Sequence, residues 1–129
     1  MKENSLYPED WSNVAQKDWR RMDIMLKEKD VEAAGYFLQQ SLEKYLKAFL
    51  LKKGWKLKKI HELDALLDDA VKFNPELSSF YSLCERVSGY YFTERYPSLT
   101  KEGLTYEDIQ NDIREAEYFI KSLFAESNK

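Results

Sequence analysis

The sequence is poor in the residues on which disulfide-rich, metal-binding and all-β proteins depend. Cys84 is the single cysteine, which excludes an intrachain disulfide and a zinc site built from cysteines. His61 is the single histidine, so no pair of histidines can bind a metal, and we expect neither a metal ion nor a cofactor. The 4 glycines and 3 prolines are too few for the many turns of a small all-β fold.

Long apolar runs are also absent. No run approaches the roughly 20 residues that a membrane-spanning helix needs, and the first ten residues, MKENSLYPED, lack the apolar centre of a signal peptide. We therefore expect a cytoplasmic protein without a membrane partner. A chain of 129 residues has enough material for one core but not for two ordinary domains, so residues 1–129 are predicted to form a single domain.

Charge is plentiful but unevenly distributed. Residues 1–60 carry 13 Lys and Arg against 9 Asp and Glu, whereas residues 61–129 carry 7 against 14. The acidic second half argues against a uniformly basic nucleic-acid binder and leaves room for a local basic groove. Aromatic residues make up 15% of the chain, more than a small core needs, so we expect some of them to line a cleft or a subunit interface.

Apolar residues recur at helical spacing in five stretches, and no segment alternates with a period of two. Pro8 and Thr105 are typical of helix starts, and Gly54 is typical of a position just beyond a helix end. The expected helices cover residues 8–29, 31–53, 60–73, 75–91 and 105–125, with residues 92–104 as a loop. The prediction is an all-α, up-and-down helical bundle of four main helices and one shorter helix.

A polar stripe interrupts the apolar pattern of the second expected helix. Gln40, Glu43, Lys44 and Lys47 share one helical face, and Glu43 and Lys47 are four residues apart in the order that favours an ion pair. Composition alone favours a solvated face with one weak ion pair. The alternative is the lining of a polar cleft.

Two further features have both a functional and a structural interpretation. The single histidine, His61, is expected near the start of the third helix, its ring meeting a neighbouring backbone group or carboxylate. A basic run with Trp55 inside it could hold a polyanion such as RNA or a nucleotide, or could be a helix end followed by a solvated loop. The run comprises Lys52, Lys53, Lys56, Lys58 and Lys59.

An arginine among aromatic residues marks the segment 90–97, YYFTERYP. The planar guanidinium of Arg95 can bind phosphate or carboxylate in a fork and can stack on rings. It can equally anchor the segment through an internal ion pair, for example with Glu43. In either case we expect the Arg95 side chain to be partly buried and to face the second helix near Glu43 or Lys47.

Three motifs in order resemble the HEPN family of small α-helical domains. The second helix reads AAGYFLQQSLEKYLKAFLLKKG, which is similar to the family pattern of a small residue, an aromatic, Gln-Gln, Glu-Lys and Lys-Ala ending at glycine. IHELDALL is similar to the family's His-x-Leu-x-x-Leu-Leu segment, and ERYP is similar to its Arg-Tyr-Pro segment. The resemblance extends from Trp11 to about Leu123.

The resemblance implies a bundle of four to five helices that commonly forms a homodimer. It also implies nucleotide binding, and pairing with a minimal nucleotidyltransferase, in some cases as toxin and antitoxin. The residues expected to line the binding cleft are Tyr36, Gln40, Glu43, Lys44, Lys47, His61, Arg95 and Tyr96. Lys47 and Arg95 would contact phosphate, and Tyr36 or Tyr96 would stack on a base.

The sequence departs from the ribonuclease members of that family, which carry an arginine followed after four to six residues by a histidine. No histidine follows Arg86, Arg95 or Arg114 at that spacing. Arginine stabilises developing negative charge but does not shuttle protons at neutral pH. The prediction is therefore a non-catalytic module that binds a nucleotide or partners a nucleotidyltransferase. The alternatives are a metal-independent ribonuclease with an atypical site and a homo-oligomer whose cleft is purely structural.

Overall fold

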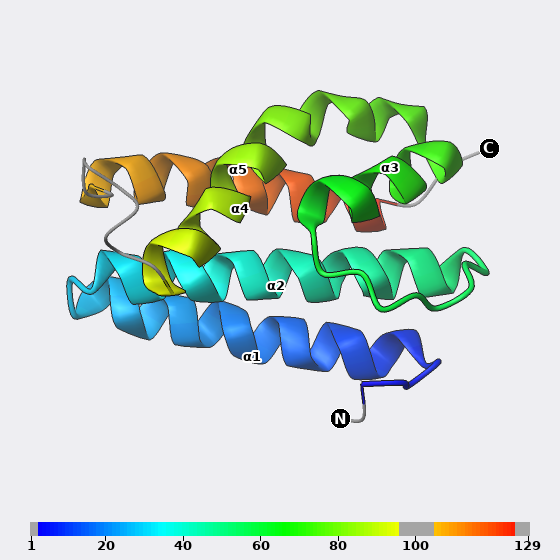
Figure 1. Ribbon diagram of the computed structural model, residues 1–129, viewed down its shortest axis with the longest axis horizontal. Coiled ribbons are helices and arrows are strands. Elements are labelled where there is room, and N and C mark those ends of the chain that lie inside the picture. The colour runs from blue at the N-terminus through cyan, green and yellow to red at the C-terminus, as the bar shows by residue number, and fades with distance from the viewer. Residues whose placement is uncertain (1–2, 96–104, 126–129) are drawn as a thin grey trace.

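The computed structural model describes residues 3–95 and 105–125, and for residues 91–95 it describes the backbone alone. These ranges contain helices and no strand, which confirms the all-α prediction (Figure 1). No helix in the described ranges is long and apolar enough to cross a membrane. The elements are α1 (Pro8–Lys27), α2 (Val31–Lys52), α3 (Leu63–Phe73), the 3-10 helix η1 (Pro75–Phe80), α4 (Tyr81–Arg95) and α5 (Tyr106–Phe124).

Helices α1 and α2 form a long antiparallel hairpin and lie side by side (Figure 1). Pro8 occupies the first turn of α1, as expected, and α1 ends at Lys27, two residues before its predicted end. The chain reverses at Lys29, whose φ of 65° lies in the left-handed region. Asp30 then caps α2 by accepting a hydrogen bond from the backbone N–H of Ala33 at 3.2 Å.

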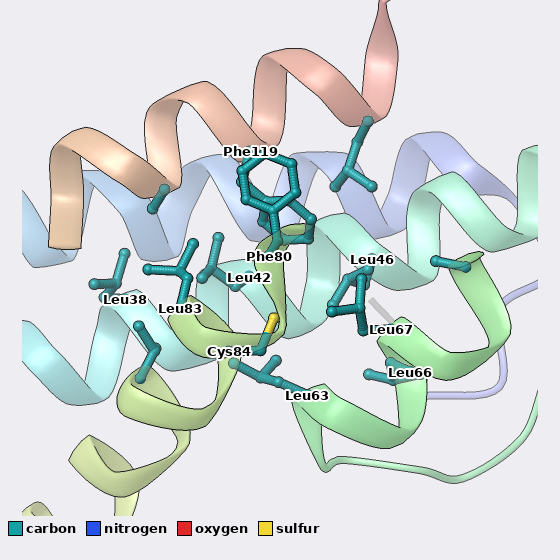
Figure 2. Packing of buried hydrophobic residues seen from close by; sticks show 14 of the residues in the cluster. Leu38, Leu42, Leu46, Leu63, Leu66, Leu67, Phe80, Leu83, Cys84 and Phe119 are labelled. Carbon is teal, nitrogen blue, oxygen red and sulfur yellow. The ribbon is translucent and has the colours of Figure 1, made fainter. Parts of the chain in front are cut away.

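Helix α2 is the central element because it packs against α1, α3, α4 and α5. It ends at Lys52, and Gly54 follows with a φ of 87°, a conformation that glycine adopts without strain. Figure 2 shows how the leucines of α2 meet apolar side chains from every later element. The residues of this buried cluster that the figure labels are Leu38, Leu42 and Leu46 of α2 and, from the later elements, Leu63, Leu66, Leu67, Phe80, Leu83, Cys84 and Phe119.

The third and fourth helices differ from the prediction at their ends. Helix α3 begins at Leu63 rather than at residue 60, because the preceding Glu62 has extended backbone angles. The fourth predicted helix is divided into η1 and α4, and the Asn74 side chain caps η1 by accepting from the backbone N–H of Glu76 at 3.2 Å. The predicted loop at 92–104 is wrong for residues 92–95, which belong to α4. Residues 96–104 lie outside the described ranges.

Helix α5 begins as the sequence predicts. Thr105 accepts a hydrogen bond from the backbone N–H of Asp108 at 3.0 Å, and the Asp108 side chain accepts from the backbone N–H of Thr105 at 3.4 Å. This reciprocal capping fixes the start of α5. Along the helix, Ile109, Ala116 and Phe119 are fully buried against the core.

Candidate functional site: a polar cleft beside helix α2

A cleft of about 670 Å³ lies along one face of α2. The N-terminal segment, α1, α2, the connection between α2 and α3, the start of α3 and α4 all contribute to its lining. Six of the residues expected from the sequence line it together: Tyr36, Gln40, Glu43, Lys44, Lys47 and His61. Arg95 is the last residue of α4, but its side chain and all of Tyr96 lie outside what the structure describes.

Helical spacing accounts for the arrangement of the α2 side chains in this cleft. Residues three or four positions apart share a helix face, which brings Gln40, Lys44 and Lys47 into one row. Gln40 Nε2 donates to Gln39 Oε1 at 2.6 Å, and Lys44 Nζ donates to Gln40 Oε1 at 3.1 Å. Gln39 is buried, so this chain of hydrogen bonds extends from the interior of the protein to the cleft.

Glu43 is the acceptor at the centre of the cleft. Its Oε2 accepts from Lys47 Nζ at 3.1 Å and lies 2.8 Å from His61 Nδ1. Both Glu43 and Lys47 are buried, with 3% and 2% of their surface exposed, so the interpretation of this face as solvated is wrong. The Lys47 ammonium also lies 5.0 Å from the ring centroid of Trp11.

His61 meets a carboxylate, as expected, although it lies in the connection before α3 rather than in the helix itself. Its side chain remains 72% exposed while one ring nitrogen is held by Glu43. The histidine is therefore anchored at one nitrogen and otherwise largely open to solvent, where it forms part of the lining of the cleft. The Glu43 carboxylate thus links α2 to the chain segment that closes one side of the cleft.

The basic run after α2 is partly tied to α3. Trp55 Nε1 donates to Asp69 Oδ2 at 2.9 Å, and Lys58 Nζ donates to the same oxygen at 3.2 Å. Burial raises the pKa of Asp69, but the hydrogen bonds from Trp55, Lys58 and Lys72 outweigh it and hold the pKa below its ordinary value. Trp55 is buried and does not line the cleft. Of the lysines in the basic run, Lys58 and Lys59 line it.

The positive and negative side chains that line the cleft are equal in number. Four lysines (Lys44, Lys47, Lys58 and Lys59) face four carboxylates (Glu3, Glu43, Glu62 and Asp64). The cleft is therefore not a uniform cationic groove. It suits a ligand that combines a negative group with uncharged hydrogen-bonding groups better than a bare polyanion. Among the described residues, no group of three or more His, Cys, Asp or Glu could hold a metal ion.

Sequence reasoning missed a second polar network, between α4 and α5. Arg86 pairs with Asp112 at 3.0 Å and with Glu115 at 2.7 Å, and the Tyr90 hydroxyl donates to the other oxygen of Asp112. Burial and the bond to Asp112 raise the pKa of Tyr90. These residues line a separate cavity of about 580 Å³. Asp112 interrupts the apolar stripe of α5, which is the only sign of this network in the sequence.

Ser88 of α4 was also missed. It lines the cleft beside α2, yet its Oγ is buried and makes no hydrogen bond within the part of the chain that the structure describes. A lone serine within a helix carries no sequence signal of such a position.

Comparison with known proteins agrees with the motifs quoted above. The family model described as "HEPN domain" matches residues 8–127, which is nearly the whole chain and includes every element of the fold. No curated protein and no solved structure matches the chain.

Proposed function

The chain belongs to the HEPN domain family, and on that premise we propose that the cleft beside α2 binds a nucleotide without cleaving it. The observation that carries the proposal is the convergence of lysines, an aromatic ring and amide side chains on one cavity of about 670 Å³. A nucleotide needs cations for its phosphates, a ring face for its base and hydrogen-bonding groups for its edges.

We assign the phosphate contacts to Lys44 and Lys59. Lys59 is exposed and Lys44 is half-buried, whereas Lys47 is buried and already bonded to Glu43. Tyr36 supplies a ring on the same face of α2 as Lys44. In this proposal Lys47 acts through Glu43, which orients His61.

The segment after α4 belongs to the same proposal. Arg95 would add a forked phosphate contact, and Tyr96 a second stacking ring. The support for these two residues is the sequence pattern ERYP and the family resemblance.

The lack of an arginine followed at short spacing by a histidine supports binding without cleavage. The single histidine lies in the α2–α3 connection and contacts a carboxylate rather than an arginine among the described residues. Cleavage of RNA by transesterification needs a positioned base and a positioned acid, and the arginine–histidine motif of the ribonuclease members is absent from this sequence.

Titration with ATP, GTP and a short RNA over a series of salt concentrations tests the proposal. We expect ATP or GTP to bind, and the double variant Lys44→Gln/Lys59→Gln to weaken binding at least about tenfold. Lys121→Gln on the exposed surface of α5 is the matched control and should bind as the unaltered protein does. Absence of binding at low salt contradicts the proposal, and shortening of the RNA favours the ribonuclease alternative.

Two further parts of the proposal concern partners. Family membership supports a homodimer, and it supports pairing with a minimal nucleotidyltransferase as part of a toxin–antitoxin pair. Light scattering checks the first part, and a species of 15.4 kDa at high micromolar concentration would contradict it. Co-purification with a nucleotidyltransferase encoded beside this chain checks the second.

A further inference from the structure

We propose that the α4 wall of the cleft binds the nucleoside part of the ligand through the hydroxyl of Ser88. The inference rests on the proposed nucleotide binding and divides the cleft into two subsites. Lys44 of α2 and Lys59 of the α2–α3 connection would hold the phosphates, and the Ser88 hydroxyl of α4 would bond a sugar hydroxyl or a base edge.

The first observation is the unmet hydrogen-bonding capacity of Ser88. Its Oγ is the one buried side-chain polar atom without a partner in the described ranges. Burial of a hydroxyl without a partner costs free energy, so such a group in a cavity wall points to a missing partner.

Two other helical serines show how such a hydroxyl is satisfied, one within its own helix and one across the core. Ser122 of α5 donates to the carbonyl of Tyr118 four residues earlier at 2.9 Å, which is the usual solution for a serine inside a helix. Ser41 of α2 donates to the carbonyl of Ala15 at 2.8 Å. Ser88 does neither, although a carbonyl four residues earlier is available to any residue in its position along α4.

The second observation is the separation of charge within the cleft. All four lysines of the lining come from α2 or from the connection after it, where they outnumber the two carboxylates of Glu43 and Glu62, whereas α4 contributes only Ser88 among the described residues. A phosphate is therefore drawn to the α2 side. A neutral hydroxyl, which donates one hydrogen bond and accepts two, suits a ribose hydroxyl or a base edge.

The stability of Ser88→Ala separates a ligand contact from a structural role. Because Ser88 Oγ makes no hydrogen bond to the described part of the chain, its removal should leave the melting temperature unchanged or slightly raised. Ser41→Ala is the comparison, because it removes a buried hydrogen bond and should lower the melting temperature. If Ser88→Ala lowers the melting temperature as much as Ser41→Ala does, the inference is overturned.

Calorimetric titration with ATP, GTP and inorganic tripolyphosphate then tests the assignment. Ser88→Ala should weaken the binding of whichever nucleotide binds more tightly about tenfold and should leave the affinity for tripolyphosphate unchanged. Lys44→Gln should weaken the binding of both probes, and Ser122→Ala should change the binding of neither.

Each other outcome has a distinct meaning. If Ser88→Ala weakens the binding of the nucleotide and of tripolyphosphate equally, the hydroxyl contacts the phosphates and the inference is overturned. If Ser88→Ala leaves the affinity for both probes unchanged, the inference is also overturned. The proposed function still stands in that case, because the unaltered protein binds the nucleotide. If no probe binds the unaltered protein, the proposed function itself fails.

Discussion

At the scale of single residues, Glu43 controls the electrostatics of the cleft because it neutralises a lysine that is 2% exposed. Replacing Glu43 with glutamine leaves the Lys47 charge buried without a counter-charge. Removal of one partner from a buried ion pair costs about 3–5 kcal/mol. We therefore expect Glu43→Gln to lower the free energy of unfolding by about that amount in urea denaturation.

Glu62→Gln provides the matched control for this prediction. Glu62 lines the same cleft but is exposed, so its loss should change the free energy of unfolding by less than about 0.5 kcal/mol. The double variant Glu43→Gln/Lys47→Met removes both charges and should recover part of the lost stability. A Glu43→Gln protein as stable as the Glu62→Gln protein would show that the Lys47 charge has another counter-charge.

The hydrogen bonds to Asp69 lead to a prediction about pH. The pKa of Asp69 in the folded protein is lowered from its ordinary value of 3.8. The charged carboxylate of Asp69 therefore stabilises the fold at pH values above 3.8. This contribution disappears as the pH falls from about 4 through the lower folded pKa. Asp69→Asn should therefore be less stable than the unaltered protein at pH 7, and the difference should shrink at pH 3 and below.

Urea denaturation followed by Trp fluorescence at both pH values measures this difference. Asp23→Asn, which alters an exposed aspartate of α1, serves as the control for general acid effects. A stability gap that stays the same from pH 7 to pH 3 would refute the role assigned to the Asp69 charge.

At the scale of elements, the capping of α5 offers a direct test of what fixes a helix start. Thr105→Ala removes the side chain that accepts from the Asp108 N–H, and loss of such a cap costs about 1 kcal/mol. Thr105→Ser keeps the hydroxyl and should retain most of the stability. Thermal denaturation of the three proteins measures the effect, and equal melting temperatures would contradict it.

The elements that sequence reasoning located well are those with local signals at their ends. Pro8 and Thr105 act through the chain next to them, so their helices start where predicted. The start of α3 was missed because His61, just before it, is held by Glu43 from another helix. The extension of α4 beyond residue 91 was missed because aromatic residues and Thr93 are weak helix formers in isolation.

The candidate site shows the same division between local and long-range information. The row of polar residues on α2 follows from helical spacing and was predicted from the sequence. The burial of Glu43 and Lys47 was not, because an ion pair four residues apart has the same pattern on a solvated helix and on a cleft wall. Ser88 and the Arg86–Asp112 pair depend on packing between helices far apart in sequence, which no local pattern reports.

At the scale of the whole molecule, Cys84 reports on the integrity of the core. It is fully buried among side chains of α2, α3 and α4 (Figure 2), and it is the only cysteine in the chain. Burial, with smaller effects from Asp64 and Glu115, raises the pKa of its thiol from 9.0 to about 12. Because the unfolded thiol ionises first, the fold should lose stability as the pH rises from 9 towards 12.

The same burial predicts how the thiol reacts at pH 8. The thiolate is the nucleophile, and in the folded protein it is both rare and inaccessible. Labelling by a thiol reagent such as iodoacetamide should therefore proceed only through opening of the core. For a domain of ordinary stability we expect the native protein to react about a thousandfold more slowly, or slower still, than the protein in concentrated guanidinium. Mass spectrometry of timed samples measures both rates. Labelling of the native protein within tenfold of the denatured rate would mean that α2, α3 and α4 do not form the closed core described above.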